Sequence, residues 1–539
     1  MPGCPDALIG LTAGSRAKAM RRGITRFGPD PDLTPDGFSE SRLERKGMAT
    51  DIPFSGIPDQ SRLFLSYLDL SPDALRFFNV PPSMDSLTAF ARSGISGLRF
   101  PRKEIASILR RQNEEFGGDD MTFAAIDELE KPDSAAVLTG QQTGIFSGPA
   151  YTIYKALTAV NLAGELKKNG IRAVPVFWME TEDHDLQEAV RRAVPDISPA
   201  AETLDYGKIL FHDEEPFRKP VGSLRFRETI QTVIDDYFGR LPESKWKAAL
   251  RSQVASVCKP GVTLAASFAR LMHQLLRGTG MIFFDPADPA SKQPAAGVFR
   301  TALNDARALY EALARRGREL EAAGFHVQAQ TRRKSALLFI IFEGTRHPIV
   351  RSGAGFRIKP DGGFYSMNEL FDRAEMLSPN VLLRPIVQDH LFPTVAYVGG
   401  AAEIAYFAQA ETLYRHFTRP MPVIWPRNSF TLIDQQTAAE MERLGLEATD
   451  CLRKECSCGG NTVKNRAAIS AACRPNGNLQ ERETGILYFI SRHGPSIIDR
   501  IRSETAPGIF AHRVLLLSDT GKTSPEAAGE DVTQEKPLS

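Results

Sequence analysis

Apolar residues in the early part of the chain recur with helical spacing. Between Ser61 and Glu130 they fall at i, i+3 and i+4, and this spacing predicts helices that include Ser61–Leu70 and Lys103–Phe116. The pattern changes at Ala135–Leu138, where consecutive apolar residues predict a buried strand. We therefore expect a helical segment that leads into an α/β core.

Two β-loop-α-β units are predicted around glycine-containing loops. In the first, Ala135–Leu138 leads through a loop to a helix that ends near Lys168, and then to a strand at Ala173–Trp178. The run AVPVFW is nearly all apolar, which is typical of a strand buried on both faces of a parallel sheet. Pro175 cannot donate a hydrogen bond to a neighbouring strand, so we expect it near the strand start or in an edge strand.

The second unit lies late in the chain. It comprises a strand at Thr394–Val398, a turn at Gly399-Gly400, a helix to about Phe417 and a strand at Pro422–Trp425, and a further core strand is predicted near 281–285. Such units form parallel sheets with right-handed crossovers. The predicted fold class is therefore α/β, with a Rossmann-like parallel core split between the two units.

Six segments are predicted from these patterns. They are a disordered tail at 1–47, with Met48 as an alternative start; N-terminal helices and the first half of the core at 48–204; connective inserts at 205–380; the second half of the core at 381–430; a C-terminal helical region at 431–517; and a disordered tail at 518–539. Within them, Phe356–Phe364 is predicted as a hairpin and Phe430–Leu446 as a helix.

Composition limits the partners and the compartment. The 66 basic and 65 acidic residues give a net charge of +1, so we expect no overall attraction to nucleic acid or to an anionic membrane. No apolar run is long enough to predict a membrane span, and Met1–Arg26 lacks the apolar stretch of a secretory signal. Six cysteines in 539 residues are far from a disulfide scaffold, so we expect a cytoplasmic protein.

The loop TGQQTGIFSGP, residues Thr139–Pro149, is the first candidate site. Its glycines allow a ligand to approach the backbone closely, and the helix that follows offers free N–H groups to an anion. The alternative is a tight packing turn, since the loop matches neither the dinucleotide fingerprint nor a phosphate-binding P-loop. The residues predicted to bind the cofactor are Thr139, Gly140, Gln141, Gln142, Gly144 and Gly148.

The segment WMETEDHD, Trp178–Asp185, places ionisable side chains directly after a buried strand. Ligands bind at the carboxyl ends of strands in open α/β sheets, and carboxylates packed this closely need cations or hydrogen-bond donors. Asp183, His184 and Asp185 are predicted to be catalytic, and Trp178 and Glu182 to contact substrate. The alternatives are a solvated acidic loop or a zinc site, although H-E-x-x-H spacing does not occur and no metal site is predicted.

The segment Leu382–Gln409 carries the third group of candidates. Glu403 and Tyr406 share one helix face after the Gly399-Gly400 turn, where they can bind an amine or a hydroxyl. The alternative is that Glu403 caps the helix and Tyr406 packs in the core. Asp389 and Glu403 are predicted to be catalytic, and Arg384, Gln388, Gly400 and Tyr406 to bind substrate. Cys451, Cys456, Cys458 and Cys473 match no standard zinc spacing.

Together these motifs closely resemble the cysteine ligase family of bacillithiol biosynthesis, the BshC family. The matching segments are AAVLTGQQTGIFSGPAYTIYKALT at 135–158, VPVFWMETEDHDLQE at 174–188, LLRPIVQDHLFPTVAYVGGAAEIAYF at 382–407, MPVIWPRNSF at 421–430 and PNGNLQER at 475–482. The resemblance implies a Rossmann-like core related to nucleotidyl-transferases and class I aminoacyl-tRNA synthetases. It also implies two connective inserts and a C-terminal coiled coil that forms dimers.

The resemblance further implies that the protein joins cysteine to glucosaminyl-malate and binds an adenine nucleotide. From the energy that amide formation needs, we expect ATP or ADP as this nucleotide, with Mg²⁺ as its companion ion. One departure concerns Cys451–Arg474, where family coiled-coil helices are expected and no sustained heptads occur. A homodimer is therefore in doubt. Two other functions stay open: a non-catalytic nucleotide-binding scaffold or degenerate paralogue, and a metal-dependent hydrolase.

Overall fold

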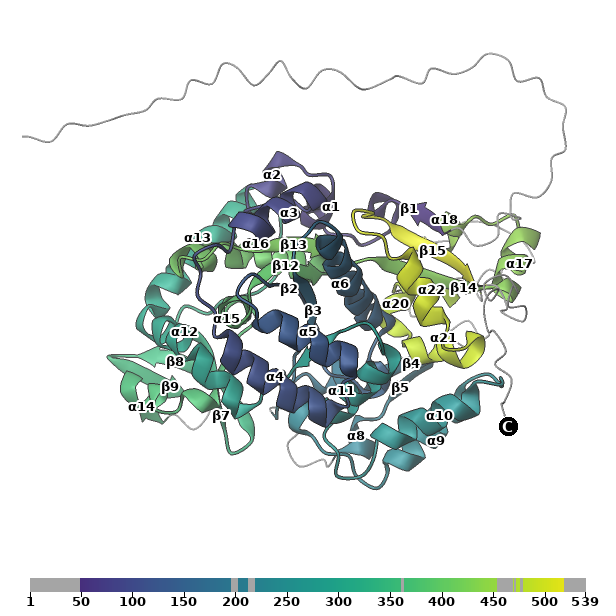
Figure 1. Ribbon diagram of the computed structural model, residues 1–539, viewed down its shortest axis with the longest axis horizontal. Helices are drawn as coiled ribbons and strands as arrows, with labels where there is room; N and C mark the ends of the chain where they lie inside the picture. Colours follow the sequence, from purple (N-terminus) through teal and green to yellow (C-terminus); the bar gives the residue numbers. More distant parts are fainter. Residues whose placement is uncertain are drawn as a thin grey trace, which may run out of the picture. The chain divides into compact units, whose positions relative to one another are not determined.

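A parallel sheet of five strands forms the core, in the order β13-β12-β2-β3-β6 (Figure 1). The computed structural model describes residues 49–194, 202–211, 219–359, 363–452, 469, 472–475 and 478–517. The strands of this sheet are β2 (Ala135–Gln141), β3 (Ala173–Met179), β6 (Ile282–Phe284), β12 (Thr394–Gly399) and β13 (Val423–Pro426). The early and late units thus share one sheet, and the predicted α/β class with a Rossmann-like core is confirmed.

The two faces of this sheet pack into different apolar cores. Ala136 and Leu138 of β2 belong to one core, and their neighbours Ala135 and Val137 belong to the other. Alternate side chains of a strand point to opposite faces, so a strand covered on both sides is apolar throughout. The helix α6 (Ala150–Lys168) covers one face, and α16 (Ala401–His416) packs into the core of the other.

Pro175 lies near the start of β3, which confirms one of its two predicted positions. The edge-strand alternative is wrong, because β3 pairs with β2 on one side and with β6 on the other. The pairing with β6 begins only at Val176, so Pro175 has a strand neighbour on the β2 side alone. A missing N–H is tolerated at such a position.

The predicted N-terminal helices are confirmed at α1 (Arg62–Leu68) and α4 (Arg102–Phe116). Ser61 begins α1 as its N-cap, since its hydroxyl accepts a hydrogen bond from the Phe64 amide at 3.3 Å. The other elements of this part are β1 (Thr50–Ile52), η1 (Phe54–Gly56), α2 (Pro72–Leu75), α3 (Met84–Ser93), α5 (Asp120–Glu130) and η2 (Ile145–Ser147).

The middle of the chain adds helices and a second sheet, in the order β10-β9-β8-β7-β11. The predicted hairpin at Phe356–Phe364 is confirmed, because Phe364 pairs with Arg357 in antiparallel register. The elements of the middle part are α7 (Leu186–Val190), β4 (Arg191–Val194), β5 (Glu202–Asp205), α8 (Gly207–Leu210), η4 (Val221–Ser223), α9 (Ile230–Arg240), α10 (Lys247–Val257), α11 (Leu264–Leu275), η5 (Pro289–Ser291), α12 (Lys292–Asn304), α13 (Ala306–Ala322), β7 (Ser335–Phe342), β8 (Thr345–Ser352), β9 (Gly355–Ile358), β10 (Phe364–Tyr365), α14 (Met367–Phe371), η6 (Ala374–Met376), β11 (Leu377–Pro379) and α15 (Arg384–Leu391).

The predicted helix at Phe430–Leu446 is wrong in its first residues. Residues Ser429–Asp434 form the strand β14, which pairs in parallel with β15 (His512–Leu517), and β15 also pairs with β1. The aromatic and β-branched residues of β14 are buried, which favours a strand. The Asp434 side chain then accepts a hydrogen bond from the Thr437 amide and begins α17 (Gln435–Arg443). The remaining elements are α18 (Ala448–Cys451), α20 (Gln480–Glu483), α21 (Ile486–His493) and α22 (Ile497–Glu504).

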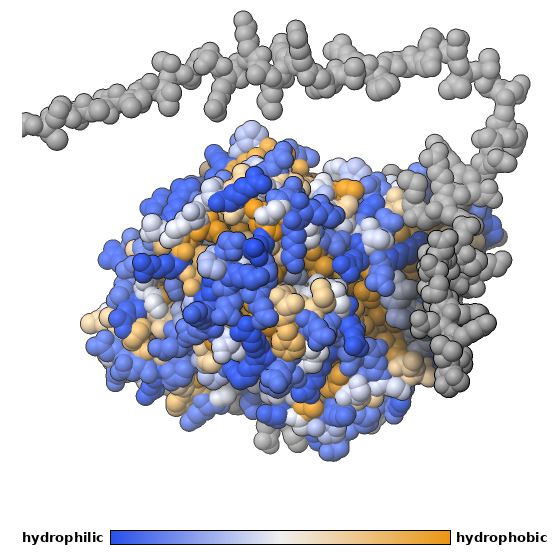
Figure 2. Space-filling model, viewed as in Figure 1, coloured by the Kyte–Doolittle hydropathy of each residue, from blue (hydrophilic) through white to orange (hydrophobic). Residues whose placement is uncertain are grey.

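No helix among the described residues is long and apolar enough to cross a membrane. Hydrophilic residues predominate on the face shown in Figure 2, with apolar ones visible in places between them. Both predicted tails, Cys456, Cys458 and most of the segment Cys451–Arg474 lie outside the described residues. The predicted domain division stays a prediction.

Candidate active site

A cavity of about 850 Å³ lies at the carboxyl edge of the parallel sheet. It opens where the strand order changes direction, between β2 and β12, which is where open α/β sheets bind ligands. Its volume falls within the range of small-molecule sites, about 300–1,000 Å³. The lining residues predicted from the sequence are Gly140, Gln141, Gln142, Trp178, Glu182, Asp183, Asp185, Arg384, Gly400, Glu403 and Tyr406.

The loop after β2 contributes only its first part to the cavity. Gly140 is required there, because a Cβ atom would lie 2.9 Å from the Trp178 carbonyl oxygen. Thr139 is buried, and its hydroxyl donates to the Val398 carbonyl at 2.9 Å, so it ties β2 to β12. Gly144 and Gly148 are not among the lining residues, and the residues between them are buried. Gly148 has a φ of +74°, a conformation that favours glycine.

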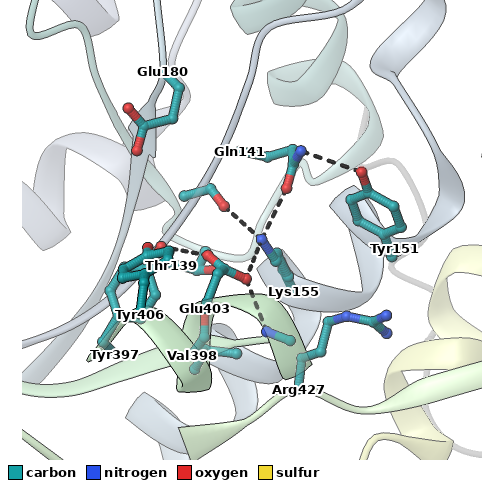
Figure 3. A network of polar contacts seen from close by, with 12 residues as sticks. Thr139, Gln141, Tyr151, Lys155, Glu180, Tyr397, Val398, Glu403, Tyr406 and Arg427 are labelled. Atoms are coloured by element: carbon teal, nitrogen blue, oxygen red, sulfur yellow. Dashed lines mark hydrogen bonds and ion pairs between the residues drawn. The ribbon is translucent and has the colours of Figure 1, made fainter. Parts of the chain in front are cut away.

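Lys155 of α6 is the centre of a buried polar network that the sequence did not single out (Figure 3). Its ammonium group donates to the Gly140 carbonyl at 2.9 Å and to Gln141 Oε1 at 2.8 Å, and it pairs with Glu403 Oε2 at 2.6 Å. Burial lowers the pKa of Lys155, and the charge of Glu403 opposes this shift. Lys155 therefore joins the loop after β2 to the start of α16.

Glu403 has more than one role in this network. Its carboxylate accepts hydrogen bonds from the Gly400 amide at 2.8 Å and from the Tyr397 hydroxyl at 2.6 Å, in addition to its contact with Lys155. The bond to Gly400 caps α16, as the structural alternative predicted, while the same side chain lines the cavity. The carboxylate is thus fixed in one orientation.

Cations from distant segments compensate the acidic residues after β3. Glu180 pairs with Arg384 at 2.9 Å, and Glu182 pairs with Lys292 at 2.5 Å. These partners come from α15 and α12, far along the chain from β3. The sequence prediction that such closely packed carboxylates need cations is confirmed at these two positions.

Asp183, His184 and Asp185 occupy different environments. Asp183 lines the cavity with Arg346 at 4.0 Å, and Asp185 lines it while accepting a hydrogen bond from the Glu188 amide at 3.1 Å. His184 is not among the lining residues, and its side chain is 42% exposed. The chain turns between these neighbours, so adjacency in sequence does not place them on one wall.

Glu180 is a cavity carboxylate whose pKa is strongly raised. Burial raises its pKa to about 7, while Arg384 opposes the shift and Asp183 adds to it. Its side chain is still 29% exposed, so it can meet a bound molecule. A carboxylate of this acidity can exchange a proton near neutral pH.

Arg384 is held by the residues behind it. Its guanidinium donates to Gln388 Oε1 at 2.7 Å and to the Tyr406 hydroxyl at 2.6 Å. Gln388 donates in turn to Asp389 at 2.9 Å, and the Tyr414 hydroxyl also donates to Asp389. Gln388 and Asp389 are buried and do not line the cavity.

Six predicted site residues thus lie behind the cavity wall or beside it: Thr139, Gly144, Gly148, His184, Gln388 and Asp389. The sequence analysis placed these six residues around the pocket, and the structure does not. They instead pack against other residues, hydrogen-bond within the protein or face the solvent. The functional roles assigned from the sequence stay predictions.

The C-terminal part completes the cavity through α20. Arg427 pairs with Glu481 at 2.5 Å, and Glu481 also accepts from the Ser429 hydroxyl at 2.9 Å. The next residues along α20, Arg482 and Glu483, line the cavity. The sequence analysis quoted PNGNLQER in the resemblance but assigned it no site residue.

Metal ligands are sparse in the part of the chain that the structure describes. No group of three or more His, Cys, Asp or Glu side chains is placed there to hold a metal ion. Of the carboxylates that line the cavity, Glu180, Glu182 and Glu403 instead pair with Arg384, Lys292 and Lys155.

Comparison with known proteins gives a consistent assignment. Residues 50–428 match the family model described as "Bacillithiol biosynthesis BshC, N-terminal Rossmann-like domain". A protein of Solibacter usitatus named "Putative cysteine ligase BshC" is 37% identical over 403 residues, covering 74% of this chain and 73% of its own length. A protein of the same name from Salinibacter ruber is 31% identical over 495 residues, covering 77% and 88%.

Among solved structures, a chain described as a "putative arginyl t-RNA synthetase" from Campylobacter jejuni covers 78% of this chain and 71% of its own length. Its TM-score of 0.28 and sequence identity of 11% are too low to carry an argument. The family model spans more than half of the chain, and it includes the strands that surround the cavity. The chain therefore belongs to the BshC family of bacillithiol biosynthesis.

Proposed function

We propose that this protein is a ligase that joins the carboxyl group of cysteine to the amino group of glucosaminyl-malate, which yields bacillithiol. The observation that carries this proposal is the convergence of the family motifs on one cavity. Gly140–Gln142, Trp178–Asp185 and Gly400–Tyr406 come from separate segments, yet each contributes residues to the lining of one cavity of about 850 Å³. The names of the relatives support the same reaction class.

Amide formation from a free carboxylate is uphill in water, so the cysteine carboxylate must be activated. We propose that ATP supplies this activation, as an acyl-adenylate or an acyl-phosphate, with Mg²⁺ carried on its phosphates. The backbone of Gly140–Gln142 and the start of α16 at Gly400 line the cavity where a nucleotide would lie. Glycine at both places lets a ligand approach the backbone closely.

Glu180 is proposed as the general base for the amine. An ammonium group cannot attack a carbonyl carbon, so it must first lose a proton. The Glu180 carboxylate accepts that proton, the amine nitrogen forms the C–N bond, and the activating group leaves with the electron pair of its C–O bond. The nitrogen then loses its second proton to solvent, which gives the neutral amide. The pKa of Glu180, raised to about 7 by burial, suits this transfer at neutral pH.

Other cavity residues are proposed to position the reactants. Arg384 holds one oxygen of Glu180 at 2.9 Å and so fixes its direction. Glu403, held by Lys155 and Tyr397, presents a fixed carboxylate that can bind the ammonium group of cysteine or the sugar amine. Asp183 and Asp185 line the acidic end of the same cavity. A cytoplasmic location is proposed with this function, because a thiol substrate needs a reducing compartment.

The test is turnover by the full chain supplied with cysteine, glucosaminyl-malate, ATP and Mg²⁺. Mass spectrometry measures bacillithiol and either AMP or ADP. Bacillithiol with AMP supports an acyl-adenylate, and bacillithiol with ADP supports an acyl-phosphate. Saturable nucleotide binding without any product would overturn the proposal and favour the non-catalytic scaffold.

A further inference from the structure

The cationic side chains that line the cavity differ in whether they have an anionic partner. Four of them do: Lys155 with Glu403 at 2.6 Å, Arg384 with Glu180 at 2.9 Å, Arg427 with Glu481 at 2.5 Å, and Arg346 with Asp183 at 4.0 Å. Arg482 lines the same cavity and is exposed, and its guanidinium has no hydrogen-bond or ion-pair partner within the described part of the chain. It is thus the cavity cation whose charge is available to a bound molecule.

The backbone that carries Arg482 is firmly held. Gln480 exchanges two hydrogen bonds with the backbone of Leu432, at 2.8 and 2.9 Å, and Glu481 is buried in its pair with Arg427. Gln480 and Glu481, which both belong to α20, therefore fix this helix against β14. Because the backbone is already ordered, only the rotamers of the Arg482 side chain have to be fixed when it binds a ligand.

A second cation lies near this head group. Burial is the main cause that lowers the pKa of Arg474, and repulsion from Arg482 adds to it, while Asp59 opposes both. The Arg474 guanidinium is buried and pairs with Asp59 at 3.7 Å, so only part of its charge adds to the positive potential at Arg482. An anion beside Arg482 would relieve this repulsion. The planar guanidinium also matches the two oxygens of a carboxylate or a phosphate.

We propose that Arg482 binds an anionic oxygen group of a substrate and so determines specificity at the C-terminal side of the cavity. This inference rests on the proposed function, which offers two sources of such a group: a malate carboxylate of the acceptor and a phosphate of the nucleotide. α20 lies beyond the residues matched by the Rossmann-like domain model, so the C-terminal part contributes to substrate choice.

The test is isothermal titration calorimetry on the full chain and its Arg482→Gln variant. The probes are glucosaminyl-malate, the methyl glycoside of glucosamine, which lacks both carboxylates, and ADP. We expect the variant to bind one of the two anionic probes about ten- to a hundredfold more weakly, as for the loss of a charged hydrogen bond. Binding of the glycoside, which carries no carboxylate or phosphate, stays unchanged. A loss confined to glucosaminyl-malate identifies a carboxylate, and a loss confined to ADP identifies a phosphate.

Two variants sharpen the result. Arg482→Lys keeps the charge but not the planar fork, so its loss is smaller than that of Arg482→Gln. Arg318→Gln removes an exposed charge from α13, away from the cavity lining, and leaves both affinities unchanged. Equal affinities of wild type and Arg482→Gln for both anionic probes would overturn the inference, as would a wild type that binds neither. A wild type that binds but makes no bacillithiol overturns the proposed function alone, because binding needs no turnover.

Discussion

Two walls of the cavity handle charge in different ways. The wall built from α6 and the start of α16 carries Lys155 and Glu403, whose side chains are 5% and 15% exposed and bonded from several sides. The wall after β3 carries Glu180, which is 29% exposed and has its pKa raised to about 7. The first wall keeps its charges fixed, while the second holds a carboxylate that gains and loses a proton near neutral pH. The first wall is therefore assigned to positioning the reactants, and the second to proton transfer.

The largest expected effect comes from Glu180→Gln. This change keeps the shape and the contact with Arg384 but removes the proton acceptor, so we expect kcat to fall by about 10²- to 10⁴-fold, the usual contribution of a general base. Steady-state bacillithiol formation at pH 7.5 measures it. Glu104→Gln on the exposed side of α4 is the matched control and should keep full activity. A Glu180→Gln enzyme with wild-type kcat would remove Glu180 from the mechanism.

The next effect concerns the fixed wall. Lys155→Met leaves the half-buried Glu403 without its cation, which we expect to cost about 3 kcal/mol of unfolding free energy, the lower end for a buried pair. Urea denaturation measures the loss. The double variant Lys155→Met with Glu403→Gln removes the orphaned charge and should recover part of this stability. The stability loss of the double variant is compared with the sum of the losses of the two single variants. If the two are equal, Lys155 and Glu403 are not energetically coupled, which would contradict their 2.6 Å contact.

A smaller effect is expected where the two walls meet. Gly140→Ala places a Cβ atom 2.9 Å from the Trp178 carbonyl oxygen, so β2 and β3 must move apart. We expect a loss of about 1–3 kcal/mol, as for other overpacked sites. Thermal unfolding measures it, with Gly164→Ala as the control, because nothing lies within 4 Å of a Cβ atom there. Equal melting temperatures for wild type and Gly140→Ala would contradict the close approach.

The smallest effect is expected at His184. Its side chain is 42% exposed and does not line the cavity, so His184→Ala should change kcat/KM by less than about threefold, or ~0.7 kcal/mol. The same kinetic assay measures it. A loss approaching that of Glu180→Gln would move His184 back among the reacting groups, as the sequence predicted.

The parts of the site that follow strand ends were predictable from the sequence. A buried apolar strand followed at once by WMETEDHD implies polar groups at the carboxyl edge of a parallel sheet, and Glu182, Asp183 and Asp185 do line the cavity there. The same reasoning located Gly140 and Gly400. The parallel pairing of the core strands also followed from the two α/β units, whereas their order in the sheet did not.

The compensating cations were not predictable in the same way. Lys155 sits within an apolar helix pattern, and only the fold shows that its ammonium group reaches Glu403, far along the chain. Lys292 and Arg346 come from segments between the two units, where no local pattern marks them. At β14, local helical spacing competed with pairing to β15, and the long-range pairing prevailed. Contacts of this kind depend on tertiary packing rather than on spacing.

The pH dependence of kcat for wild type and Glu180→Gln tests the central claim most directly. A general base works only when deprotonated, and the folded pKa of Glu180 lies at about 7, so kcat of the wild type should be low at pH 6 and rise through an inflection near pH 7. Glu180→Gln should keep a low kcat without this inflection. An inflection of the same size near pH 7 in both enzymes would contradict the assignment of the chemistry to the wall after β3.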